Sequence, residues 1–219
     1  MAPRYLTPNS QDGSVRVLQL TDCHLFADPN RDLLGVKTSE SMDAVIDAVL
    51  EQNFDFDFVA VTGDLSQDYS LRSYEHFAQK IARLQKPVFF LPGNHDDGPL
   101  MYRIFDKLGV NIAKNVITPK WQYIFLNSEV YAVAHGWILR DQLDYAAYCA
   151  HRSPSQHVCI LVHHLPLLVG SRWLDTQTMH NSDEFNTYIH RINNVRAIVS
   201  GHIHQEYDET IRDVRYIAT

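Results

Sequence analysis

The sequence predicts an α/β domain built around a parallel β-sheet. Three short apolar stretches in the first half are each followed by a polar loop, in a repeating strand, loop and helix order. Each stretch also stops at polar residues rich in aspartate, asparagine and histidine. This order favours parallel strands joined by right-handed crossovers, with a site at the carboxyl ends of the strands.

The first half of the chain begins with a polar lead-in over residues 1–13. Residues 15–21 then alternate like a half-buried strand and end at Asp22. Apolar residues at helical spacing predict a helix over 39–50, and a fully apolar run predicts a buried strand over 58–62. The next expected elements are a helix over 71–84 and a strand over 88–91.

The second half contains four further strands by the same criteria. Short apolar runs predict strands over 122–126, 157–162, 196–200 and 214–219. Two stretches with apolar residues at helical spacing predict helices over 139–150 and 183–192. Residues 1–219 show no repeat or linker, so one domain is expected.

Composition limits the partners. A formal net charge of −7 argues against a broad surface for nucleic acid or anionic membrane. The three cysteines, Cys23, Cys149 and Cys159, have no framework spacing and are expected to be reduced thiols. No apolar run approaches the roughly 18 to 20 residues that span a bilayer, and the first residues lack the apolar core of a signal peptide. A cytoplasmic location is therefore expected.

Metal-type ligands follow five of the expected strands. Because strand ends at one edge of a sheet converge, these side chains can share a pocket. A spacing of two would place two such side chains on one side of an extended backbone, and a glycine before a ligand permits a sharp turn. Imidazole, carboxylate and amide donors suit Mn, Fe, Zn or Ni better than Ca. The segments are Asp22-Cys-His24, Gly63-Asp64, Gly93-Asn94-His95-Asp96, His163-His164 and Gly201-His202-Ile-His204.

Each of these segments alone also has a structural interpretation. Gly-Asp and Gly-Asn-His-Asp have the chemistry of ordinary turns, and the paired histidines could be one core and one exposed residue. Gly-His-Ile-His is the strongest single motif. Five segments in this order, each after an expected strand, favour a metal site over five independent turns.

This order resembles that of the calcineurin-like metallophosphoesterases, and the resemblance runs from Asp22 to His204. Within that family the sequence is most similar to the bacterial class III cyclic-AMP phosphodiesterases. The narrower similarity is carried by Thr21-Asp-Cys-His-Leu-Phe-Ala, Leu33-Leu-Gly-Val-Lys-Thr, Val162-His-His-Leu-Pro-Leu, Trp173-Leu-Asp175, Asn181 and Gly201-His-Ile-His-Gln-Glu206.

The resemblance implies a different sheet arrangement and a complete ligand set. The fold would be an α/β sandwich of four layers, with two mixed sheets flanked by helices. Two metal ions would be bound, Fe or Mn first and Zn, Ni or Mg as alternatives. Asp64 would bridge them, and His95 would stay off the metals and act as the acid. The first ion would be held by Asp22, His24 and His204, and the second by Asn94, His163 and His202.

The implied reaction is hydrolysis of 3′,5′-cyclic AMP to 5′-AMP. Two ions about 3.5–4 Å apart can share a hydroxide that attacks phosphorus in line. His95 would protonate the leaving ribose oxygen, and Asp96 would either orient that imidazole or only stabilise a turn. His164 stays off the ligand set, as a packing or substrate-contacting residue.

Two departures from the family pattern affect these expectations. Leu165 stands where relatives often carry histidine or proline, so substrate contacts there can differ. Relatives continue for several strands past the position of Thr219, so the last C-terminal strands are expected to be missing. An exposed sheet edge would then be open to pairing with a second copy, as a homodimer.

Alternative functions stay open at this point. The same metal core serves phosphomonoesterases and hydrolases of other phosphodiesters, and segments 28–38 and 166–182 would decide among them. A non-catalytic scaffold would be expected to lose the acid or several ligands, and all are present here. A nuclease is disfavoured, since no basic stripe accompanies the acidic balance.

Overall fold

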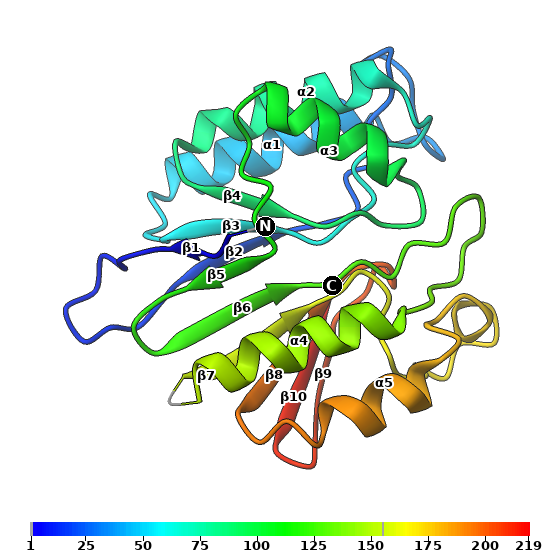
Figure 1. The fold of residues 1–219 in the computed structure, drawn as a ribbon. Coiled ribbons are helices and arrows are strands. Elements are labelled where there is room, and N and C mark those ends of the chain that lie inside the picture. The colour runs from blue at the N-terminus through cyan, green and yellow to red at the C-terminus, as the bar shows by residue number, and fades with distance from the viewer. Residues whose placement is uncertain (1, 155) are drawn as a thin grey trace.

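Two β-sheets pack face to face, and helices cover their outer faces (Figure 1). The computed structural model describes residues 2–154 and 156–219. The smaller sheet has three parallel strands: β2 (Val17–Leu20), β3 (Phe58–Val61) and β4 (Val88–Phe90). Its outer face is covered by α1 (Thr38–Glu51), α2 (Leu71–Ile81) and α3 (Gly98–Lys107), seen above the sheet in Figure 1. A short 3-10 turn, Ala82–Leu84, extends α2.

The larger sheet is mixed and has the strand order β1-β5-β6-β7-β8-β10-β9. Pairing is antiparallel between β5 and β6 and between β9 and β10, and parallel elsewhere. Helices α4 (Arg140–Arg152) and α5 (Ser182–Ile189) lie on its outer face. The strands are β1 (Arg4–Tyr5), β5 (Asn115–Ile117), β6 (Trp121–Phe125), β7 (His157–Leu161), β8 (Val195–Ser200), β9 (Tyr207–Ile211) and β10 (Val214–Ala218).

Alternation along the strands produces three apolar layers. In β3, Phe58 and Ala60 point between the sheets, whereas Val59 and Val61 point toward α1–α3. In β7, Cys159 and Leu161 meet the inner layer and Ile160 packs under α4 and α5. A strand buried on both faces needs apolar residues at every position, which explains the continuous apolar runs of β3 and β7.

The two sheets flanked by helices confirm the fold that the resemblance implied, and the single parallel sheet was wrong. The first three strand units do form a parallel sheet, but the later strands form a second sheet instead of extending it. The smaller sheet is parallel throughout, not mixed.

Some elements carry weak sequence signals and were not expected. Strand β1 has two residues inside the expected lead-in. Helix α3 starts in Asp97-Gly98-Pro99, which looks like a turn; in fact Asp97 caps the helix by accepting a hydrogen bond from Leu100 N at 2.9 Å. Strand β9 is largely exposed and has no apolar alternation. Within the described residues, no helix is both long and apolar enough to cross a membrane.

Candidate metal centre

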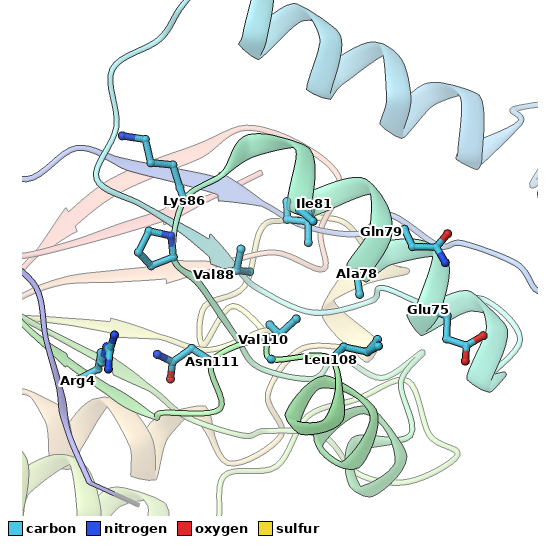
Figure 2. A pocket seen from close by; sticks show the side chains of 13 residues that line it. Arg4, Glu75, Ala78, Gln79, Ile81, Lys86, Val88, Leu108, Val110 and Asn111 are labelled. Atoms are coloured by element: carbon cyan, nitrogen blue, oxygen red, sulfur yellow. The ribbon is translucent and has the colours of Figure 1, made fainter.

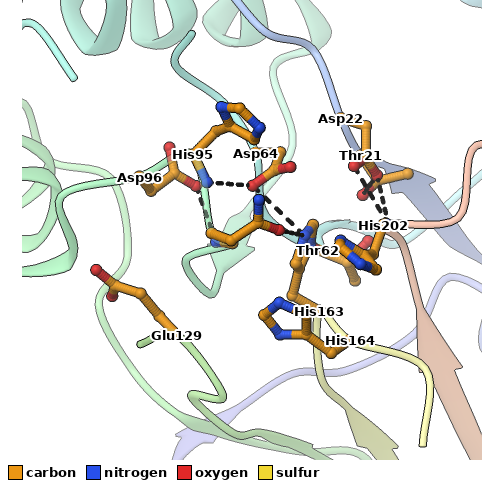
Figure 3. Close-up of polar contacts among 12 residues, drawn as sticks. Thr21, Asp22, Thr62, Asp64, His95, Asp96, Glu129, His163, His164 and His202 are labelled. Atoms are coloured by element: carbon orange, nitrogen blue, oxygen red, sulfur yellow. Dashed lines mark hydrogen bonds and ion pairs between the residues drawn. The ribbon is translucent and has the colours of Figure 1, made fainter. Parts of the chain in front are cut away.

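The segments singled out in the sequence meet where the two sheets end side by side. The smaller sheet contributes the loops after β2, β3 and β4, and the larger sheet those after β7 and β8. Figure 3 shows Asp64, His163 and His202 directed toward one another from these different strands. Ligands more than 100 residues apart in sequence therefore share one pocket.

Asp22, His24 and His204 form the first group of donors. Their ligand atoms lie within 4.8 Å of one another. His204 Nε2 is 3.1 Å from Asp22 Oδ1 and 3.3 Å from His24 Nε2. The other nitrogen of His24, Nδ1, is hydrogen-bonded to Gln67 Oε1 at 2.8 Å. Gln67 therefore sets the tautomer that leaves Nε2 of His24 free for a metal.

His163, Asn94 and His202 form the second group. His163 Nδ1 donates to the carbonyl of Thr62 at 2.7 Å, which leaves Nε2 facing Asn94 Oδ1 at 3.1 Å. His202 Nε2 contacts the carbonyl of Gln177 at 3.0 Å, so Nδ1 is its remaining ring nitrogen.

Asp64 lies between the two groups. Its Oδ1 is 3.4 Å from His163 Nε2, and its Oδ2 is 3.8 Å from His24 Nε2. Burial alone would raise the pKa of Asp64, but His163, through charge and a hydrogen bond, holds the pKa well below its usual range. A buried carboxylate with one oxygen toward each group has the position expected of a bridging ligand.

The surroundings of the histidines shift their pKa values in different directions. Burial lowers the pKa of His24 and that of His202, so both favour the neutral form that binds metals. The pKa of His163 rises despite burial because of the charge of Asp64, and a hydrogen bond to Asp22 raises that of His204. The same carboxylates that favour a proton on these two imidazoles would also attract a metal cation.

The donor set fits two metal ions. Nitrogen and oxygen atoms with lone pairs face one another at 3.1–3.4 Å, as in the His24–His204 pair, and a cation between them would be coordinated by both. Glycines make room for this approach. A Cβ on Gly63, whose φ is +101°, would lie 2.5 Å from His163 Nδ1, and one on Gly93 would collide with the Asp64 carboxylate.

The backbone that presents the ligands differs from the expected extended one. Five of the seven expected ligands have positive φ angles, between +46° and +72°. The side chains of Asp22 and His24, and of His202 and His204, thus converge through left-handed turns and not through strand alternation. Such residues cost about 1–3 kcal/mol each and persist where a site requires them.

His95 lies beside the donors. Its backbone N–H donates to Asp64 Oδ1 at 2.8 Å, and its ring packs edge-on against His24 with 5.0 Å between centroids. A ring nitrogen of His95 also comes within 4.8 Å of the His24 and Asp64 donors. The ring of Tyr69 stacks on that of His95 with 6.5 Å between centroids, and the Tyr69 hydroxyl donates to the Asn94 carbonyl at 3.2 Å. Tyr69 was not singled out in the sequence, where nothing marks it.

Asp96 is hydrogen-bonded through its carboxylate to the backbone of two site loops. Its buried carboxylate accepts hydrogen bonds from the backbone N–H groups of Gly93 at 2.9 Å and of Leu65 and Ser66 at 3.1 Å. No hydrogen bond joins it to the His95 ring among the described residues. Burial, followed by the charge of Asp64, raises the pKa of Asp96. These contacts favour the turn-stabilising alternative, and a role of Asp96 in orienting His95 stays a prediction.

His164 keeps both ring nitrogens occupied. Nδ1 is 2.8 Å from the Ser128 hydroxyl and Nε2 is 3.2 Å from the Ala134 carbonyl. Although one of its nitrogens lies within 4.8 Å of those of His163 and His202, this hydrogen bonding supports leaving it out of the ligand set. Two further residues were also not singled out: Glu129, labelled near the site in Figure 3, and Ser128, which contacts His164.

Cavity size alone would not locate this centre. A cavity of about 620 Å³ lies below α2, lined by Arg4, Glu75 and Lys86 among others, and includes none of the metal-type ligands (Figure 2). A cavity of about 390 Å³ includes Asp22, His24 and His204. The centre is identified by its donors.

Comparison with known proteins agrees with this geometry. Residues 15–206 match the model of the calcineurin-like phosphoesterase family. The chain is 40% identical over 213 residues to the 3′,5′-cyclic adenosine monophosphate phosphodiesterase CpdA of Escherichia coli K12, covering 97% of this chain and 78% of that protein. It is 34% identical over 205 residues to the 3′,5′-cyclic-nucleotide phosphodiesterase alr5338 of a Nostoc species, covering 94% and 77%.

Solved structures share the fold at low sequence identity. A dimetal phosphatase from Danio rerio has a TM-score of 0.67 at 11% identity, covering 93% of this chain and 86% of that one. The protein TT1561 of Thermus thermophilus has a TM-score of 0.63 at 15% identity, covering 94% and 89%. With the family model matched over most of its length, the chain belongs to the calcineurin-like phosphoesterase family.

Proposed function

We propose that this protein hydrolyses 3′,5′-cyclic AMP to 5′-AMP at a centre that holds two metal ions. The observation that carries the proposal is the convergence of nitrogen and oxygen donors from both sheets around Asp64, with His95 beside them. The calcineurin-like phosphoesterases depend on dinuclear metal centres. Relatives named as cyclic-AMP phosphodiesterases that match 97% of the chain support the choice of substrate.

The ligand assignment is part of the proposal. Asp22, His24 and His204 would hold one ion, Asn94, His163 and His202 the other, and Asp64 both. Fe and Mn are the proposed metals, with Zn, Ni and Mg as alternatives compatible with the donors. When bound, two such ions activate water and neutralise charge on the phosphoryl oxygens.

His95 is proposed to donate the proton to the leaving ribose oxygen. An alkoxide is a poor leaving group, and a positioned general acid typically contributes about 10²–10⁴-fold. The backbone N–H of His95 donates to Asp64 Oδ1 at 2.8 Å, and its ring contacts those of His24 and Tyr69. The acid is thus fixed relative to the same carboxylate that joins the two groups of donors.

The test is hydrolysis after reconstitution with Mn²⁺. The substrates compared are 3′,5′-cyclic AMP, cyclic GMP, 2′,3′-cyclic AMP, bis(p-nitrophenyl) phosphate and p-nitrophenyl phosphate. Preference for 3′,5′-cyclic AMP, lost in Asn94→Ala, is the expected result. Activity on bis(p-nitrophenyl) phosphate alone would support metal-dependent hydrolysis of phosphodiesters but reject 3′,5′-cyclic AMP as the substrate. If the metal-bound protein hydrolysed none of these substrates, the proposal that it is a phosphoesterase would be rejected.

A further inference from the structure

An apolar cleft opens directly beside the first group of metal ligands. It has a volume of about 390 Å³, within the range of small-molecule sites. Asp22, His24 and His204 line part of it, and the rest of the lining comes from the end of β2, the Leu33–Val36 turn and the first half of α1. A phosphate ester held at the metal ligands would therefore have this cleft next to its organic part.

The rim of the cleft exposes large apolar side chains to solvent. Leu34 is 97% exposed, Val36 54% and Val45 45%. The turn that carries Leu34 is well defined, because Leu33 and Val36 exchange two backbone hydrogen bonds of 2.9 and 3.0 Å and Gly35 N donates to Asp32 Oδ1. Exposed apolar groups gathered around a concave surface mark a binding groove more often than isolated ones do.

The charge of the cleft limits what it can hold. Among the residues that the structure describes, no lysine or arginine lines the cleft, and the ionisable groups in the lining are those of Asp22, His24, His204 and Cys23. A second phosphate or another anion would find no cation in the cleft itself. A flat, uncharged and largely apolar group fits this lining.

We propose that the cleft binds the nucleobase of a cyclic mononucleotide, with the base against Leu34, Val36 and Val45 and the phosphate at the metal ligands. The inference rests on the proposed function and adds the residues that recognise the base. It makes the Leu33–Val36 turn a specificity element that distinguishes a nucleotide from a simple phosphodiester.

A cycle of paired changes tests the contact. The substrate pair is 3′,5′-cyclic AMP and the 3′,5′-cyclic phosphate of 1-deoxyribose, which carries hydrogen in place of the base. The protein pair is wild type and Leu34→Asn, since asparagine tolerates the positive φ of +52° at this position. We expect the ratio of kcat/KM for the two substrates to fall about tenfold in Leu34→Asn.

A matched control separates the cleft from general surface effects. Val45 and Leu50 lie on the same helix and are both 45% exposed, but only Val45 lines the cleft. Val45→Ala should lower the same ratio, and Leu50→Ala should leave it unchanged. An unchanged ratio in both Leu34→Asn and Val45→Ala would overturn the base site while leaving cyclic-AMP hydrolysis by the wild type, and so the proposed function, standing.

Binding can be measured without turnover. With Zn²⁺-loaded protein, 5′-AMP should shift the methyl resonances of Leu34, Val36 and Val45 more than ribose 5-phosphate does. Equal shifts with the two ligands would place the base elsewhere. If the wild type cleaves bis(p-nitrophenyl) phosphate but neither cyclic phosphate, the proposed function itself fails, and the base site with it.

Discussion

Asp64 and Asp96 are both buried carboxylates, and their neighbours give them different roles. Asp64 faces ring nitrogens of His24 and His163, whereas Asp96 faces backbone N–H groups. Imidazoles that can release a proton allow a metal ion to take its place, but backbone N–H groups cannot. The groups around each carboxylate, and not the residue type, therefore distinguish the proposed metal ligand Asp64 from the structural contacts of Asp96.

His95→Ala should lower turnover of 3′,5′-cyclic AMP by about 10²–10⁴-fold, because the leaving oxygen would lose its acid. Folding and metal content should stay close to those of the wild type, since it is the backbone of His95, not its ring, that binds Asp64. Steady-state kinetics and metal analysis of the same preparation measure both. Turnover equal to that of the wild type would remove His95 as the acid.

Mn²⁺ binding should release protons at neutral pH, and its affinity should rise with pH. The carboxylates of Asp64 and Asp22 raise the pKa of His163 and of His204, so the metal-free protein holds protons that the ions must displace. Affinity is therefore weakest at low pH and increases as the pH rises toward the raised pKa values. Calorimetry in buffers of different ionisation enthalpy counts the protons, and identical heats in all buffers would contradict this.

At the scale of elements, one carboxylate ties two ligand loops together. Asp96 lies in the loop after β4 and accepts hydrogen bonds from Leu65 and Ser66 in the loop after β3. These loops carry Asn94 and Asp64, so the separation of these two proposed ligands depends on the buried hydrogen bonds of Asp96, which is not itself a proposed ligand.

Asp96→Asn should destabilise the metal-free protein by about 2 kcal/mol, because an amide nitrogen would face buried N–H donors. Metal retention should fall as the two loops loosen. Asp97→Asn is the matched control: it is the adjacent residue, and asparagine also caps a helix, so stability should change by less than about 0.5 kcal/mol. Urea unfolding and metal analysis measure the pair, and equal stabilities would show that Asp96 is not needed.

Local sequence patterns were sufficient to predict the core strands and the sequence positions of the candidate ligands. Continuous apolar runs marked β3 and β7, and polar residues after them marked the site, because both depend on neighbours in sequence. The division of the strands into two sheets depends on long-range pairing, which the periodicity of a segment does not contain. Only the family resemblance predicted it. The left-handed backbone at Asp22 and His202 was also missed, since tertiary contacts impose a conformation that neither residue type requires.

For the whole molecule, the candidate ligand set joins two sheets that otherwise meet through an apolar layer and a hydrogen bond from Gln19 Nε2 to the Ser200 carbonyl. Four candidate ligands, Asp22, His24, Asp64 and Asn94, follow strands of the smaller sheet, and the other three, His163, His202 and His204, follow strands of the larger one. Metal ions at this centre would therefore crosslink both halves of the sandwich. Three expectations stay predictions: residues 1–219 form one domain, the protein is cytoplasmic, and it forms a homodimer.

Metal binding should then stabilise the whole fold and not only the loops. At a free Mn²⁺ concentration about 100 times its dissociation constant, the gain is about 2.7 kcal/mol, provided that the unfolded chain does not bind the ion. For a chain of this size that corresponds to a rise in Tm of about 5–10 °C.

Asp64→Asn should abolish most of the rise, because Asp64 faces both groups of donors. Asp144→Asn, which changes an exposed carboxylate on α4, should keep it. Calorimetric scans of the three proteins with and without Mn²⁺ measure this. If Asp64→Asn responded like the wild type, the ions would be binding elsewhere on this acidic chain, and the crosslink between the sheets would not exist.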